Sequence, residues 1–225
     1  AYPGKKIIFS LGRLVAYKGY RWLIAAARYL DDDYVELIGG SGSMKRELML
    51  EIERYGVADK VSLLGRIPDN ELPTYYGACT LFCLSSVQKT EAFGIVQLEA
   101  MSCGKPIVAT RIPHSGVAWV NEHGLSGLDV EPKDAKGLAE AIMAIAGDEA
   151  AYQEYTRVSR QKPQDVNQKF SMDSAMQENP SGNPSTDGVI YEPSDASKAD
   201  LNKAPSSGSG HAMHSNQKAS EAEEY

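Results

Sequence analysis

Two glutamates separated by a glycine and apolar residues lie in the stretch TEAFGIVQLEAMSCG, residues 90–104. If a helix starts near Phe93, its first N–H groups and its dipole favour an anion, and Gly94 lets a phosphate approach closely. Glu91 and Glu99 would repel that phosphate unless they accept hydrogen bonds from hydroxyls on either side of it. A nucleotide-diphosphate sugar has hydroxyls at both ends. The alternative, a capping acid at Glu91 and a solvated Glu99, stays open on spacing alone.

A pair of basic residues follows the first apolar run of the chain. The run KIIFSL (6–11) leads into GRLVAYKGY (12–20), which carries Arg13 and Lys18 beside two glycines. Such a pair can hold a diphosphate through charge-assisted hydrogen bonds that contribute about 1.5–3 kcal/mol each. Two solvated surface bases are the alternative that these residues leave open.

The glycine-rich segment GGSGS (39–43) is not the dinucleotide-binding fingerprint, because Lys45 stands where the third glycine would be. Either a close approach of the backbone to a ligand or a neighbouring loop, or an ordinary glycine turn, explains it. The acidic run DDD (31–33) follows an expected helix and predicts a solvated turn, with no metal bound there. The loop histidines, His114 and His123, show no pattern that indicates catalysis.

Short apolar strands alternate with amphipathic helices along most of the chain. The expected strands are 6–11, 34–40, 60–65, 80–86, 105–110 and 127–132. The expected helices are 20–30, 43–56, 69–79, 93–104, Asp134 to about Gly147, 149–161 ending before Pro163, and a short piece at 170–176. This alternation predicts an α/β fold, a Rossmann-like, doubly wound parallel sheet covered on both faces.

Doubly wound sheets bind their ligands in the loops beyond the carboxyl ends of the strands. In this sequence those loops are 12–19, 39–43, 65–69, 85–93 and 111–116. We therefore expect the functional residues to lie there.

Composition divides the chain into one folded domain, residues 1–178, and a tail, residues 179–225. The tail is rich in Ser, Pro, Gly and Asn and has few large apolar residues, so it is predicted to be disordered. From Gln177 onward there are eight acidic and three basic residues, and the whole chain has a net charge of −7. The remainder is close to neutral, which argues against a global field that attracts nucleic acid or an anionic membrane.

Three cysteines, Cys79, Cys83 and Cys103, lie in apolar runs without the spacing of metal ligands. They are predicted to be buried, reduced thiols, which indicates a cytoplasmic location. The sequence has no apolar stretch near the roughly 20 residues of a spanning helix, and its first residues do not read as a secretory signal.

Several motifs together resemble one known family. The segments GRL…KG, GGSG, LLGRIPDNELPTYY, SSVQKTEAFGIVQLEAMSCGKPIVAT and SGVAWVNEHGLSGLDVEP are similar to the C-terminal, donor-binding domain of retaining GT-B glycosyltransferases of family four (group 1). The likeness covers about residues 5–176 and is most specific at 84–131. Glu91 and Glu99 match the E-x7-E motif of that family.

The resemblance implies a role for each matched residue. Arg13 and Lys18 would contact the diphosphate, and together with Glu91 they form the expected catalytic set. Glu91 would bind sugar hydroxyls, and Glu99 would bind the ribose hydroxyls. The complete implied donor-binding set is Arg13, Lys18, Arg66, Ile67, Glu91, Phe93, Gly94, Ile95, Val96 and Glu99, in which 93–96 act through backbone N–H groups and 66–67 border the base. The resemblance implies neither a cofactor nor a metal.

The function implied is donor binding in a retaining, metal-independent hexosyltransferase that uses a UDP- or GDP-sugar in polysaccharide or lipopolysaccharide biosynthesis. An N-terminal acceptor domain, or a partner copy, is expected to be needed for transfer, and peripheral membrane association is expected only through the full enzyme. Nucleic acid is not an expected partner. Two alternatives remain: a non-catalytic nucleotide-binding or interaction module, and a fragment of a sugar-nucleotide epimerase.

Overall fold

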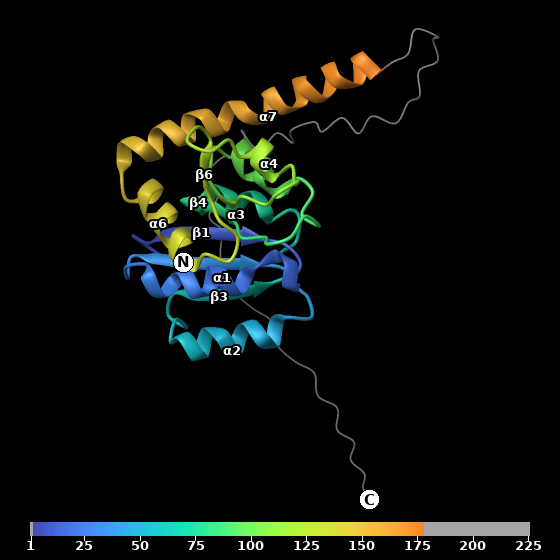
Figure 1. Ribbon diagram of the computed structural model, residues 1–225. Helices are drawn as coiled ribbons and strands as arrows, with labels where there is room; N and C mark the ends of the chain where they lie inside the picture. Colours follow the sequence, from blue (N-terminus) through green and yellow to red (C-terminus); the bar gives the residue numbers. More distant parts are fainter. Residues whose placement is uncertain (1, 178–225) are drawn as a thin grey trace, which may run out of the picture. The chain divides into compact units, whose positions relative to one another are not determined.

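A parallel, six-stranded sheet forms the centre of the computed structural model, which describes residues 2–177 (Figure 1). Its strands are β1 (Lys6–Leu11), β2 (Tyr34–Gly39), β3 (Val61–Gly65), β4 (Leu81–Leu84), β5 (Ile107–Thr110) and β6 (Gly127–Val130). The order across the sheet is β3-β2-β1-β4-β5-β6, with parallel neighbours throughout. This is the order of a doubly wound sheet, so the predicted fold is confirmed. The predicted tail, 179–225, lies outside the described residues.

The central strands are buried on both faces. All residues of β2, β4 and β5 are buried, and β1 pairs with β2 along its whole length, from Lys6 opposite Tyr34 to Leu11 opposite Gly39. Parallel sheets covered on both sides require such nearly continuous apolar runs. The sequence signal for these strands was therefore strong.

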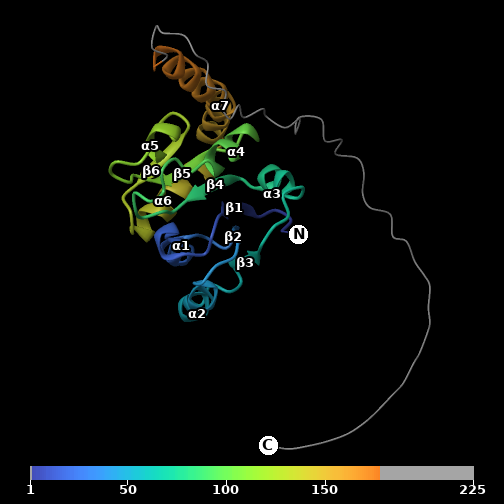
Figure 2. The same cartoon turned by 90° about the vertical axis from the view of Figure 1, so that its right-hand side faces the viewer.

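Helices cover the sheet on both sides and create two apolar cores. One core is covered by α1 (Tyr20–Ala26), α2 (Lys45–Tyr55) and α6 (Ala135–Ala146), with the short 3-10 helices η1 (Ala16–Lys18) and η2 (Ala27–Tyr29) beside α1. The other is covered by α3 (Leu72–Ala78), α4 (Val96–Ser102) and the single turn α5 (Val117–Val120). Figure 2 shows α1 and α2 on one side of the sheet and α3 on the other. The segment after β5, expected to be only a loop, thus contains a turn of helix.

The ends of α6 agree with the sequence prediction. The side chain of Asp134 accepts a hydrogen bond from the N–H of Gly137 at 2.8 Å, and the helix ends before Gly147. A carboxylate at this position satisfies an N–H group that has no partner within the helix.

The prediction of a helix that ends before Pro163 is wrong. Residues Glu149–Gln177 form one continuous helix, α7, with Pro163 inside it and the expected piece at 170–176 as its last part (Figure 1). A proline in a helix removes one hydrogen bond, here to the carbonyl of Ser159. Tertiary contacts hold the preceding turn, because Ser159 Oγ donates to the carbonyl of Ser126 at 3.1 Å and α7 packs on α4 and α6. Neither α7 nor any other helix of residues 2–177 is long and apolar enough to cross a membrane.

Candidate functional site

The loops that follow β1 and β4 meet at the point where the strand order of the sheet reverses. The N–H of Val87 donates to the carbonyl of Tyr17 at 2.7 Å, and Ser85 Oγ donates to the carbonyl of Lys18 at 3.0 Å. Gly19 has a φ of 69°, and a Cβ there would lie 2.0 Å from the carbonyl oxygen of Ser85. Only glycine permits this contact, which fixes the two loops together at the usual ligand position of a doubly wound sheet.

Lys18 and Glu91 form a buried ion pair at this position. Lys18 Nζ lies 2.6 Å from Glu91 Oε2, and the two side chains are 11% and 9% exposed. Ser86, which is fully buried, donates its hydroxyl to the same oxygen at 2.6 Å. Among the described residues no donor reaches Glu91 Oε1, and this oxygen is not among the buried atoms that lack a partner. Glu91 is therefore held through one oxygen and presents the other outward.

The segment after Glu91 is fixed by the loop that follows β5. Ser115 Oγ donates to the carbonyl of Glu91, and the N–H of Gly116 donates to the carbonyl of Ala92 at 2.6 Å. The ring of Phe93 covers Gly116, where a Cβ would lie 2.4 Å from Phe93 Cδ1. The loops after β1 and β5 thus both support this short segment of the loop after β4.

The prediction that a helix starts near Phe93 is wrong by three residues, since α4 begins at Val96. Gly94 has a φ of 63°, a left-handed conformation that cannot belong to a right-handed helix. Within residues 2–177, no acceptor receives the N–H of Gly94, Ile95 or Val96, whereas the N–H of Gln97 bonds to the carbonyl of Gly94 at 2.8 Å. Consecutive N–H groups without acceptors form a site suited to an anion.

Glu99 lies one turn into α4 and is half-buried. Its Oε2 accepts a hydrogen bond from the hydroxyl of Tyr76, on α3, at 2.7 Å. Burial raises the pKa of Tyr76 far above its ordinary value, and the negative charge of Glu99 adds to this effect. The phenol therefore keeps its proton and acts as a donor. Sequence reasoning missed Tyr76 because its partner lies on another helix, and it also missed Ser86, which lies five residues before Glu91 in the same loop.

The remaining predicted residues also lie in loops beyond the carboxyl ends of the strands, but not all of them lie close to the Lys18–Glu91 pair. Arg13 is exposed, and its Nη2 donates to the hydroxyl of Tyr17 at 3.2 Å. Arg66 is exposed on the loop after β3, two strands from β1, which is roughly 10 Å at the usual strand spacing. Ile67 is buried in the core and its side chain packs beside Gly39. Its side chain is therefore part of the core.

The glycine-rich segment brings two loops together. A Cβ on Gly40, whose φ is 132°, would lie 1.8 Å from the carbonyl oxygen of Gly12, and one on Gly42 would lie 2.3 Å from that of Leu14. The N–H of Leu14 also donates to the carbonyl of Ser41 at 2.9 Å. Of the two interpretations of these glycines, the structure favours a close approach to the neighbouring loop. This contact holds the loop that carries Arg13 in place.

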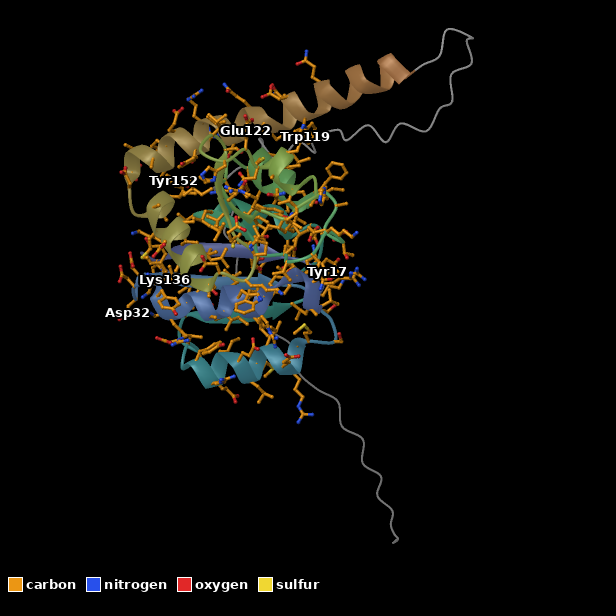
Figure 3. All side chains as sticks on the ribbon, in the orientation of Figure 1. Tyr17, Asp32, Trp119, Glu122, Lys136 and Tyr152 are labelled. Carbon is orange, nitrogen blue, oxygen red and sulfur yellow. The ribbon has the colours of Figure 1, made fainter. Side chains whose placement is uncertain are left out.

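The acidic run 31–33 lies at the other edge of the sheet, and Figure 3 shows Asp32 far from Tyr17. Asp32 pairs with Lys60 at 3.0 Å and Asp33 with Lys6 at 3.1 Å. No group of three His, Cys, Asp or Glu residues suited to a metal occurs in the part of the chain that the structure describes. The run thus binds lysines near the amino ends of the strands.

The two loop histidines, His114 and His123, and the three cysteines take no part in these contacts. His114 is exposed with a φ of 59°, and His123 Nδ1 accepts a hydrogen bond from the N–H of Asp129 at 2.9 Å. Cys79 and Cys83 are buried thiols as predicted, whereas Cys103 is only partly buried. Burial raises the pKa of Cys79 to about 12, so its thiol stays protonated at neutral pH.

Comparison with known proteins gives a family match. The family described as glycosyl transferases group 1 matches residues 1–163. Mannosylfructose-phosphate synthase of Agrobacterium fabrum is 31% identical over 168 residues, which cover 70% of this chain and 36% of that protein. The lipopolysaccharide core biosynthesis glycosyltransferase LpsE of Rhizobium meliloti is 34% identical over 142 residues, covering 63% and 40%. The chain thus matches less than half the length of these curated relatives.

A solved structure extends the likeness to three dimensions. The crystal structure of Anabaena HepE in complex with UDP superposes with a TM-score of 0.67 at 26% identity, over 79% of this chain and 49% of that one. The two chains share the fold of the described domain.

Proposed function

The chain belongs to the glycosyl transferases of group 1, and from this premise we propose that residues 1–178 bind the nucleotide-diphosphate sugar donor of a hexosyltransferase. The match over residues 1–163 supports the family, and the UDP complex of Anabaena HepE supports the kind of ligand. The relatives are more than twice as long as the matched part, so we propose that acceptor binding and efficient transfer need residues beyond this domain.

One arrangement carries the proposal: the Lys18–Glu91 pair lies beside the N–H groups of Gly94, Ile95 and Val96 at the reversal point of the sheet. A cation and several N–H groups suit the charge of a diphosphate. The outward oxygen of Glu91 suits a hydroxyl. Phosphate and sugar thus find complementary groups within one short segment.

The proposed roles follow from what each side chain can donate or accept. Lys18 and the exposed Arg13 bind the phosphate oxygens, and Glu91 Oε1 accepts a hydrogen bond from a sugar hydroxyl. Glu99 accepts one from the ribose, and the backbone of 66–67 borders the base. The roles of Glu91 and Glu99 rest on their match to the E-x7-E motif.

For the reaction itself we propose retention without a metal. The bond between the anomeric carbon and the phosphate oxygen breaks, and the acceptor hydroxyl attacks from the face that the phosphate leaves. The departing phosphate takes the proton of the acceptor. Lys18, Arg13 and the N–H groups stabilise the charge that develops on the diphosphate, which is the role electrostatic preorganisation plays in catalysis.

The acceptor class is proposed from the relatives. LpsE of Rhizobium meliloti is a lipopolysaccharide core biosynthesis glycosyltransferase, and on this likeness we assign the chain to polysaccharide or lipopolysaccharide assembly. The base of the donor is uracil or guanine.

The test is calorimetric titration of the chain with UDP and with GDP, in buffer with and without EDTA. We expect one nucleotide to bind equally in both buffers, and an Arg13→Ala/Lys18→Ala variant to bind it at least roughly tenfold more weakly, since each charged hydrogen bond contributes about 1.5–3 kcal/mol. Lys136→Ala is the matched control, because Lys136 lies on α6, away from Tyr17, and among residues 2–177 it pairs only with Glu140 on its own helix (Figure 3).

The outcomes separate the parts of the proposal. Absence of binding by either nucleotide at millimolar concentration would contradict donor binding by this domain. Loss of binding in EDTA would contradict metal independence alone. An equal effect of Lys136→Ala would show that the variants act through general charge and that the proposed site is wrong.

A further inference from the structure

Glu99 is held in the same way as Glu91, through one oxygen. Its Oε2 accepts the hydroxyl of Tyr76 at 2.7 Å, and its Oε1 receives no donor from the described residues and is not a buried atom without a partner. No lysine or arginine of the described part of the chain pairs with Glu99, so Tyr76 is the side chain that fixes the direction of this carboxylate.

The direction of the Tyr76 hydroxyl is itself fixed by the core. The ring of Tyr76 packs edge-on against Phe9, with centroids 5.3 Å apart and planes at 80°, and lies 5.8 Å from the ring of Phe82. Tyr76 is only 3% exposed. A buried phenol needs a hydrogen-bond partner, and here the partner is a residue of the candidate site rather than a backbone carbonyl.

We propose that Tyr76 is a positioning residue, which holds Glu99 so that its Oε1 accepts a hydrogen bond from the ribose of the bound nucleotide. The inference rests on the proposed function, because it assigns the ribose to Glu99. It adds a residue on α3 whose hydroxyl acts only through Glu99. A site built in this way resembles others in which supporting hydrogen bonds fix the groups that contact the ligand.

The test compares a nucleotide with its analogue that lacks the ribose hydroxyls. The full chain is titrated calorimetrically with UDP and 2′,3′-dideoxy-UDP, or with the guanine pair if GDP is the nucleotide that binds. For the wild-type chain we expect a preference of roughly tenfold or more for the ribose form, the effect of a hydrogen bond to a charged group. In Tyr76→Phe this preference should decrease by a factor of roughly five, while the affinity for the dideoxy form should stay within about twofold of the wild-type value.

Tyr75→Phe is the matched control. Tyr75 is the neighbouring residue and stacks on the same Phe9 ring at 5.6 Å, and its hydroxyl makes no hydrogen bond to any described residue. Its variant should keep the wild-type preference. Glu99→Gln should lose the preference, and adding Tyr76→Phe to it should cause little further loss, since the two side chains act as one unit. Removal of one oxygen leaves the Tyr76 ring contacts in place, and a cooperative thermal transition checks that each variant is folded.

Three results would overturn the inference. An unchanged preference in Tyr76→Phe would show that Glu99 does not need its partner. Equal weakening of both nucleotides would show a merely structural role. If the wild-type chain binds neither UDP nor GDP, the proposed function fails and the inference fails with it. If the wild type binds a nucleotide and Tyr76→Phe keeps the same preference for the ribose form, only the inference fails.

Discussion

At the scale of residues, the site is organised by opposite charges that satisfy each other. Lys18 and Glu91 are both buried, and buried charges are stable only where they are paired and hydrogen-bonded. Each is the partner of the other, and the hydroxyl of Ser86 donates a further hydrogen bond to Glu91. Residue types and spacing made Lys18 and Glu91 candidates for a ligand site, and the family resemblance gave them their expected roles. Their mutual contact could not be predicted, because it joins positions 73 residues apart that only the reversal of the strand order brings together.

One buried acid lies outside the site and gives a prediction for stability. Glu36, in β2 between Ile8 of β1 and Val61 of β3, is fully buried, and neither of its carboxyl oxygens has a hydrogen-bond partner in the described part of the chain. Burial raises the pKa of Glu36 well above its ordinary value. An acid with a raised pKa in the folded state destabilises folding once the unfolded chain loses its proton, above about pH 4.3.

We therefore expect Glu36→Gln to stabilise the protein more as the pH rises. Near pH 4 the Glu36 carboxyl is mostly protonated in both the folded and the unfolded wild-type chain. At that pH the substitution therefore changes the free energy of unfolding little through ionisation. Above that pH the wild type loses about 1.4 kcal/mol per pH unit until the folded pKa is reached, and the glutamine variant does not. Urea unfolding of both proteins at pH 4.5 and pH 7.5 measures the difference. An equal effect at the two pH values would show that the pKa of Glu36 is not raised in the folded protein.

At the scale of elements, the strands were predictable and two helix boundaries were not. Nearly continuous apolar runs, interrupted by Glu36 in β2, marked β2, β4 and β5, as is typical of a covered parallel sheet. The start of α4 depends on the left-handed backbone at Gly94, which no periodicity reveals. The continuation of α7 past Pro163 depends on contacts with the body of the domain, such as the bond from Ser159 to Ser126.

Pro163→Ala tests whether the helix runs through this position. If it does, the substitution restores an N–H donor and removes a steric conflict, and we expect the free energy of unfolding to rise by about 1–3 kcal/mol. Urea unfolding measures the change, and amide exchange should slow at residues 159–166. Pro73→Ala is the control, because Pro73 lies in the first turn of α3, where no hydrogen bond is lost to proline. An unchanged stability and exchange in Pro163→Ala would favour a helix that ends before this residue.

At the scale of the whole domain, the topology places the site. All six strands run parallel, so the loops after β1, β2, β3, β4 and β5 share one edge, and the loops of β1 and β4 become neighbours where the order reverses. The alternation of strands and helices predicted the parallel sheet, and with it which loops share this edge. The sequence could not predict which of these loops touch. The contacts depend on glycines such as Gly19 and Gly40, which leave room for a carbonyl group of another loop.

The most direct measurement of the central claim is a nitrogen-15 NMR titration of the chain with UDP and GDP in EDTA. We expect the bound nucleotide to shift the amide resonances of Gly94, Ile95 and Val96 most strongly, because their N–H groups have no acceptor among the described residues. Amides near Asp32, at the other edge of the sheet, should stay unchanged (Figure 3). A nucleotide that binds but leaves residues 94–96 unaffected would contradict a donor site at this loop.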